Sequence, residues 1–171
     1  MAAVRMAPPL RKAVLTAHVA ASVGWLGAVA ASIALALAAL TSPDLRVVRA
    51  AYLAMDMLGW SVLVPISVAS LLTGLVQSLG TVWGLVRHYW VLFKLFINVV
   101  ATAVLLLYTQ TLGLLADRAA DPASTLAQLR GPSPLVHAGA GLLLLVGATV
   151  LSVYKPRGVT GFGLRRAAAA A

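Results

Sequence analysis

The 171-residue sequence contains no cysteine and no glutamate. Without cysteine, the chain cannot form a disulfide, a thiolate metal site or a cysteine nucleophile. Without glutamate, it cannot carry the His-Glu-x-x-His motif of zinc peptidases, and it also lacks Gly-x-Ser-x-Gly and a phosphate-binding loop. These absences remove the common hydrolase motifs, so the residues alone leave enzymatic activity open and favour a non-enzymatic role.

Charged residues are also scarce, at 10% of the chain, whereas soluble domains usually contain about 25%. Hydrophobic residues make up 61%, and the mean hydropathy is +0.97. A helix needs about 20 apolar residues to cross a bilayer, and four windows qualify, 13–40, 57–79, 90–116 and 134–154. Lys94 is the only Asp, Glu, Lys or Arg inside them. We therefore expect a single all-α membrane domain over residues 1–171, a polytopic bundle of four transmembrane helices in up-down order.

The net charge of +9 is distributed unevenly across this topology. One side carries eight basic residues, which are Arg5, Arg11, Lys12, Arg87, Lys155, Arg157, Arg165 and Arg166. The other side carries four basic residues together with all the acids, which are Arg46, Arg49, Arg118, Arg130, Asp44, Asp56, Asp117 and Asp121. An excess of Lys and Arg marks the cytoplasmic side, so we expect both termini in the cytoplasm.

Several further expectations follow from the same composition. Abundant alanine and the preference for arginine over lysine are typical of GC-rich bacterial genomes and favour the bacterial cytoplasmic (inner) membrane. The first window is longer than the apolar region of about 7–15 residues in a signal peptide, so we expect it to be retained. The basic tail, 155–171, is expected to be disordered and to contact anionic lipid head groups. Nucleic-acid binding is not expected, because no basic patch is interleaved with aromatic residues.

Each window carries one stripe of polar or small side chains at helical spacing. In chain order the stripes are His18, Ser22, Trp25, Ala28 and Ser32; Ser67, Ser70, Gly74 and Gln77; Lys94, Asn98, Thr102 and Thr109; and His137, Gly141, Ala148 and Ser152. In lipid, such faces turn inward and bond neighbouring helices. Because helix direction alternates, His18, Gln77 and Lys94 fall at one depth in the cytoplasmic half. Asp56 and His137 fall in the opposite half.

Ionisable residues inside a membrane predict a functional site, because burying a lysine at a helix centre costs about 3 kcal/mol. Imidazole is a common axial ligand of b-type haem, and helix bundles commonly house such cofactors. His137 cannot pair with His18, because the two lie about 20 Å apart across a hydrocarbon slab of ~30 Å. The remaining pairs are His18 with Lys94 and His18 with His88. In the alternative interpretation, Lys94 extends to the inner head groups and His88 is an interfacial residue.

A family resemblance bears on this choice. The pattern His18-x6-Trp25, with Lys12 six residues before the histidine, resembles the first helix of the membrane-bound, haem-b-containing protoporphyrinogen oxidase family. The pattern Trp90-x3-Lys94 is similar to a later helix of that family. The resemblance implies that His18 and Lys94 form an essential haem-site pair, with haem iron as the metal, and that Trp25 and Trp90 pack around the haem.

The resemblance covers two segments of about ten residues each and the overall hydropathy. After Leu26-Gly27 the chain runs into Ala and Leu, where the oxidase family has polar and aromatic residues. We therefore do not transfer the oxidase reaction to this chain. The same His-x6-Trp opening also resembles the copper-resistance D family. As a whole, the chain most resembles the uncharacterised small four-helix membrane proteins of bacteria.

Two other functions compete with haem-dependent redox chemistry. Met55-Asp56-Met57 falls near the depth of His137, and thioether and imidazole ligands suit Cu(I), so copper handling is one alternative. The other is a non-catalytic accessory or structural role in the membrane, without a cofactor. Gly24-x-x-x-Ala28 could support a homo-oligomer. The sequence does not identify a substrate, an electron partner or a membrane-protein partner.

Overall fold

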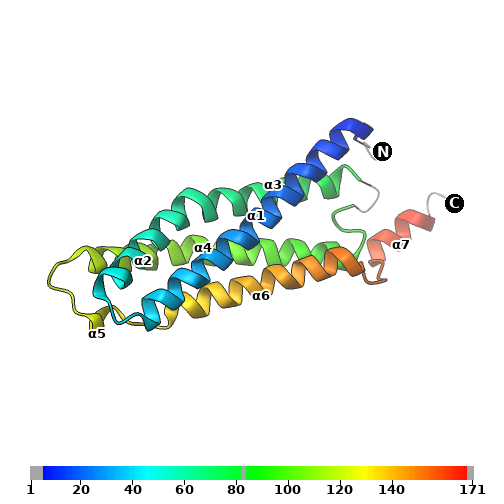
Figure 1. Cartoon of the computed structure of the whole chain (residues 1–171). Helices are drawn as coiled ribbons and strands as arrows, with labels where there is room; N and C mark the ends of the chain where they lie inside the picture. Colours follow the sequence, from blue (N-terminus) through cyan, green and yellow to red (C-terminus); the bar gives the residue numbers. More distant parts are fainter. Residues whose placement is uncertain (1–5, 82–83, 169–171) are drawn as a thin grey trace.

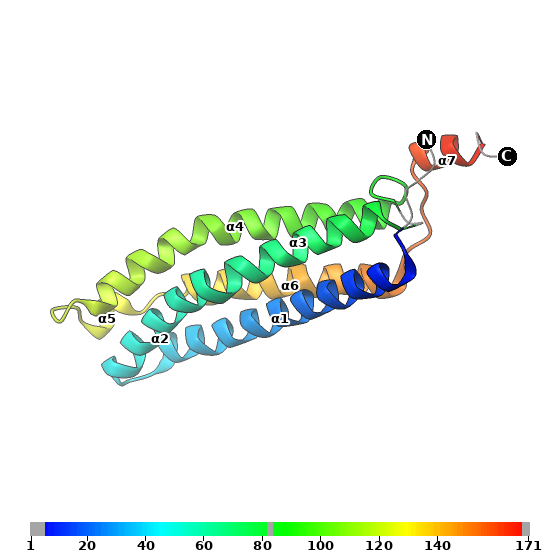
Figure 2. The same cartoon turned by 90° about the horizontal axis from the view of Figure 1, so that it is seen from above.

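The computed structural model describes residues 6–81 and 84–168. The chain folds into four long helical spans that lie side by side (Figures 1 and 2). They are α1 (Pro8–Thr41), a composite second span, α4 (Tyr89–Ala120) and α6 (Ser133–Tyr154). All four are long and apolar enough to cross a membrane. The prediction of an all-α chain with four such helices is therefore confirmed.

The second span has three parts, α2 (Leu45–Leu58), the π-helical turn η1 (Gly59–Leu63) and α3 (Val64–Leu79). Pro65 lies in the first turn of α3, directly after the π-helical turn. Proline cannot donate a backbone hydrogen bond and its ring crowds the preceding turn. A π-bulge is a frequent way to accommodate such an interruption within a helix. The helix therefore continues through the proline instead of ending there.

Consecutive spans run in opposite directions, so the bundle has two distinct ends (Figure 1). The start of α1 and the short helix α7 (Gly161–Ala168) lie at one end, which we call the terminal end. The short helix α5 (Leu126–Leu129) lies at the other, the α5 end. α1 packs against the second span and α6, and α4 packs against the same two spans. α1 and α4 therefore lie diagonally across the bundle.

The second span begins earlier than its predicted start at residue 57. Asp44 caps α2 by accepting a hydrogen bond from the backbone N–H of Arg46 at 2.8 Å, and the side-chain hydrogen bond from Arg46 lowers the pKa of Asp44. The buried face of α2 then repeats at intervals of three and four residues, at Val48, Ala51, Tyr52 and Met55. This amphipathic face extends the helix although its arginines lower the local hydropathy. The other three spans also start or end a few residues outside their predicted windows.

Apolar packing is concentrated in the middle of the bundle and at the α5 end. One buried cluster surrounds Tyr52 and Leu129, and a second surrounds Trp25 and Leu145. Large apolar side chains on the outside, such as Leu107 at 74% exposed, are placed for contact with lipid. Both clusters lie beyond the terminal half of the bundle, towards the α5 end. The interior of the terminal half is built from more polar side chains, which form the candidate site.

Arginine side chains hydrogen-bond to backbone carbonyls of the connections at the α5 end. The Arg49 guanidinium donates through Nη2 to the carbonyl oxygens of Asp121, Pro122 and Ser124, at 3.0, 3.0 and 3.1 Å. Arg130 donates to the carbonyl of Ser42 at 2.6 Å. Carbonyls just beyond a helix C-terminus have no helical partner, so a cation there supplies both hydrogen bonds and a favourable charge. These contacts hold the α4–α6 connection against the start of α2.

The segment after Tyr154 differs from the disordered tail that we expected. The Thr160 hydroxyl donates to the carbonyl of Val86, and its oxygen accepts the backbone N–H of Gly163 at 3.2 Å. The N–H of Tyr89 also donates to the carbonyl of Gly158 at 3.3 Å. These contacts fix residues 158–160 against the α3–α4 connection, and α7 follows. The tail is therefore ordered over its described part because specific backbone contacts replace the apolar burial that it lacks.

Candidate cofactor site

His18 lies on the face of α1 that packs against α3. Its Nδ1 is 3.1 Å from the carbonyl oxygen of Ser70 and 3.1 Å from the hydroxyl oxygen of Thr73. A carbonyl can only accept, so Nδ1 must be the donor. The Thr73 hydroxyl donates its own proton to the carbonyl of Ala69 at 2.6 Å, so it too is free to accept from Nδ1–H. In the neutral form of the imidazole, this network fixes the tautomer, with the proton on Nδ1 and the lone pair on Nε2.

The imidazole of His18 is seated against Gly74. A Cβ atom added at Gly74 would lie 3.0 Å from Cε1 of the ring, which is closer than side-chain carbons normally approach. Glycine therefore permits the contact between the ring and the α3 backbone. One turn further along α1, the hydroxyls of Ser22 and Ser70 are 3.1 Å apart and share a hydrogen bond. The α1–α3 interface is thus polar and specific at this depth, as small polar faces in membranes tend to be.

Lys94 approaches this region from the diagonal helix α4. It interacts electrostatically with His18 and with Lys155 at the end of α6. Its Nζ lies 5.9 Å from the ring centroid of Trp90, at the limit of a cation–π contact. The four acidic residues of the sequence all belong to the α5 half or its connections. The charged groups around Lys94 are therefore cationic, and its charge is not compensated by a carboxylate of this chain.

Two buried polar atoms continue the stripe of Lys94 into the bundle. Within the described part of the chain, the amide oxygen Oδ1 of Asn98 and the hydroxyl oxygen of Thr102 are buried without a hydrogen-bond partner. They follow Lys94 by four and eight residues, so they share its face of α4. Buried polar atoms are almost always paired, with water or a ligand when not with protein. The interior of the terminal half therefore contains polar atoms to which the described side chains make no hydrogen bond.

The other residues predicted for the site are distributed more widely. Trp25, at 3% exposed, belongs to the apolar cluster in the middle of the bundle, further from the terminal end than His18. His88 immediately precedes α4, and its ring centroid is 6.5 Å from that of Trp90. The structure therefore brings His18, Lys94 and Trp90 to one end, while Trp25 lies deeper. The role of these residues in cofactor binding stays a prediction.

The proposed copper ligands do not converge as a set. Met55 is buried, whereas Met57 is 67% exposed on the opposite side of α2. Because α2 begins well before both residues, side chains two positions apart must point in different directions. Among the described residues, no group of three or more His, Cys, Asp or Glu side chains is placed to hold a metal ion. Met55 lines a cavity together with His137, whereas Met57 is exposed, and copper handling stays a prediction.

Two features were missed by sequence reasoning. Thr73 is not part of the polar stripe that we assigned to the second window, yet it contacts the His18 ring. Tyr108 stacks on His137, with ring centroids 3.8 Å apart and planes inclined by 15°. A tyrosine twelve residues before the end of α4 carries no sequence signal for such stacking. Only the distance between α4 and α6 determines it.

Comparison with known proteins adds no family assignment. No protein-family model matches the chain, and no curated protein or solved structure is significantly similar to it.

Proposed function

We propose that this chain is a multi-pass protein of the bacterial cytoplasmic membrane that binds b-type haem through His18 for electron transfer. The observation that carries the proposal is the hydrogen bond from Nδ1 to the Ser70 carbonyl, which in the neutral ring leaves the lone pair of Nε2 for a ligand. Histidines that ligate metals usually donate their other ring N–H to a carbonyl or carboxylate, which fixes the tautomer and orients the ring. The His18 imidazole meets this requirement before any iron is bound.

The donor chemistry of the site fits a haem iron. His18 offers Nε2, and Lys94 offers an amine that is coupled to it electrostatically. Trp90 lies beside that amine. His18 is only half buried, so part of its ring is accessible from outside the bundle. When bound, the haem supplies one-electron chemistry; the chain supplies ligation, ring orientation and a polar surrounding through Ser22, Asn98 and Thr102.

The proposal is tested by an absorption spectrum of the detergent-purified full chain, expressed with ample haem and recorded before and after dithionite. We expect a Soret band and sharp α and β bands after reduction. A featureless spectrum at full protein recovery and unchanged helicity would contradict haem binding. It would leave the non-catalytic membrane accessory role as the better account, with Lys94 extended towards the head groups.

The orientation of the bundle supplies a second prediction. We propose that the terminal end faces the cytoplasm, which is supported by the excess of Lys and Arg there. The cysteine-free sequence permits single-cysteine labelling without background. A membrane-impermeant maleimide should label Ala127→Cys on α5 in intact cells and Arg157→Cys only after permeabilisation; both positions are exposed. The reverse pattern would contradict the orientation without affecting the haem proposal.

A further inference from the structure

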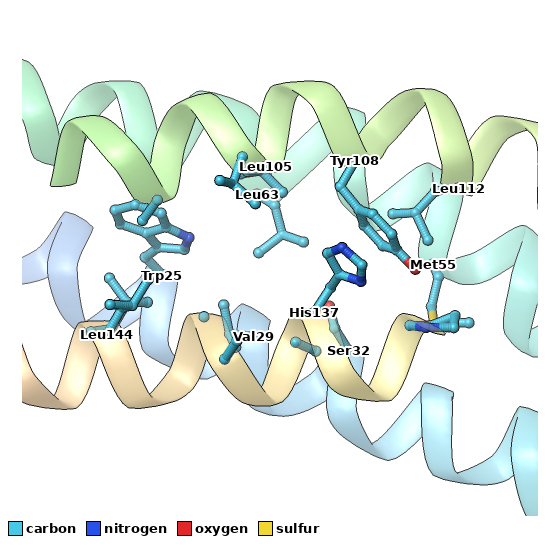
Figure 3. A pocket seen from close by; sticks show the side chains of 17 residues that line it. Trp25, Val29, Ser32, Met55, Leu63, Leu105, Tyr108, Leu112, His137 and Leu144 are labelled. Atoms are coloured by element: carbon cyan, nitrogen blue, oxygen red, sulfur yellow. The ribbon is translucent and has the colours of Figure 1, made fainter. Parts of the chain in front are cut away.

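A cavity of about 130 Å³ lies in the middle of the bundle, outside the candidate haem site (Figure 3). All four spans contribute to it, and neither His18 nor Lys94 lines it. An engineered apolar cavity of about this size binds benzene in a soluble protein. The cavity is therefore large enough for one six-membered ring and far too small for a porphyrin.

The side walls of the cavity are apolar and partly open to lipid. Small residues of α6, including Gly141, leave the space; a Cβ atom added at Gly141 would meet no atom within 4 Å. Val104 on α4 and Leu144 on α6 line the cavity and are also exposed at the surface of the bundle. A ligand dissolved in the bilayer can therefore reach the cavity between these two helices without crossing water.

One end of the cavity presents a hydrogen-bond acceptor. The Nδ1 of His137 is 2.9 Å from the carbonyl oxygen of Ser133, so Nδ1–H is the donor, and in the neutral form of the ring Nε2 is an acceptor. The ring is held by its stacking on Tyr108. The Tyr108 hydroxyl is in turn 3.0 Å from the Ser133 hydroxyl. The Ser133 carbonyl and the Tyr108 ring thus orient His137.

The other end presents a hydrogen-bond donor. Trp25 is almost completely buried and lines the cavity, and among the described residues no group accepts a hydrogen bond from its indole N–H. Figure 3 shows the indole nitrogen on the side of the ring that faces His137. A buried indole N–H usually has a partner. The donor at this end is therefore available to a ligand.

The separation of the two ends limits the shape of the ligand. Trp25 belongs to the same buried cluster as Ala101, and His137 stacks on Tyr108, which follows Ala101 by seven residues on α4. At 1.5 Å per residue, the two ends are about 10 Å apart. A quinol has its para oxygens roughly 5.5 Å apart, so with a hydrogen bond of about 2.9 Å at each end it spans about 11 Å, close to this separation.

We infer that this cavity binds the head group of a membrane quinol. One hydroxyl of the quinol donates to Nε2 of His137, and the oxygen para to it accepts from the indole N–H of Trp25. The ring fills the apolar space beside Gly141, and any isoprenoid tail leaves between α4 and α6 into lipid. An oxidised quinone has no hydroxyl to donate to Nε2 of His137, so the site favours the reduced form. This inference does not depend on haem binding.

The test uses trimethylhydroquinone, a single-ring quinol without a tail, titrated under argon into the detergent-purified full chain and followed by calorimetry. We expect saturable binding that is at least about tenfold tighter than binding of 1,2,4,5-tetramethylbenzene, which has no oxygens. One lost hydrogen bond to a ligand corresponds to about tenfold or more. Equal affinity for the two compounds would overturn the quinol assignment.

Matched variants locate the site. Gly141→Leu fills the cavity and should abolish binding, whereas Gly139→Leu makes the same change at an α6 position that does not line the cavity and should preserve it. His137→Phe keeps a ring beside Tyr108 but removes Nε2, and should weaken quinol binding about tenfold or more while leaving tetramethylbenzene unaffected. Circular dichroism confirms folding of each variant. Unchanged quinol affinity in a folded Gly141→Leu variant would overturn the proposal, and loss of binding in Gly139→Leu alone would do the same.

Discussion

Replacing His18 by alanine is expected to remove the Soret band of the purified protein completely, while His88→Ala retains it. The difference follows from the surroundings of the two rings. His18 is fixed by Ser70 and Thr73 inside the bundle, with Nε2 left for iron, whereas His88 precedes α4 in the connection at the terminal end. The measurement is the ratio of Soret absorbance to protein absorbance, at matched haem supply. Retention of the full band in His18→Ala, or its loss only in His88→Ala, would contradict the ligand assignment.

A smaller change, at the glycine that the His18 ring packs against, tests the same ligand assignment. Gly74→Ala places a methyl group 3.0 Å from Cε1, so the ring must shift and its hydrogen bond to Ser70 must lengthen. We expect partial loss of haem, since a displaced imidazole still carries Nε2. Gly147→Ala is the control, because its added methyl meets nothing within 4 Å. Equal haem content in the two variants would show that the ring position does not matter for ligation.

Truncation of Tyr52 is expected to cause the largest loss of stability. Tyr52 is 1% exposed at the centre of the apolar cluster near the α5 end, and its hydroxyl donates to the carbonyl of Leu129 at 2.6 Å. Tyr52→Ala leaves a cavity and an unpaired carbonyl, so we expect a loss of about 3–5 kcal/mol in the free energy of unfolding. Tyr52→Phe removes only the hydrogen bond and should cost about 1–2 kcal/mol.

The stability measurement is reversible unfolding in mixed micelles, followed by circular dichroism. Tyr154→Ala is the matched control, because Tyr154 is 78% exposed at the end of α6 and should contribute little. If Tyr52→Ala were as stable as Tyr154→Ala, the packing described for the α5 end would be wrong. Because the cluster lies far from His18 along the bundle, the Tyr52 variants test the packing at the α5 end and the His18 variants test haem ligation.

Hydropathy was sufficient to predict the four spans, because each needs a long uninterrupted apolar window to be placed in lipid. It failed at the start of α2, where Arg46 and Arg49 lower the average while Val48, Ala51 and Tyr52 still form a buried face. It also failed after Tyr154, where α7 follows a few backbone hydrogen bonds to the α3–α4 connection. Such bonds depend on which segments meet, and no residue pattern encodes them.

The candidate site was predictable in its depth and only partly in its contacts. The constant rise of a helix relates residue number to depth, so the electrostatic interaction between His18 and Lys94 agrees with the predicted level. The acceptor for His18 is a backbone carbonyl, which every residue has, so Ser70 could not be recognised by its side chain for this role. The pairing of Trp25 with His137 around one cavity also depends on helix spacing that the sequence does not reveal.

The most direct test of the central claim, ligation of haem iron by the His18 imidazole, is chemical rescue of His18→Gly. This substitution leaves a space of imidazole size between α1 and α3. The purified variant is incubated with haem, with and without added imidazole, and its reduced spectrum is recorded beside that of Gly147→Ala. We expect His18→Gly to show no α and β bands without imidazole, and we expect the bands to return when imidazole is added. Bands that are unaffected by the substitution, or a wild-type protein that takes up no haem under the same conditions, would contradict it.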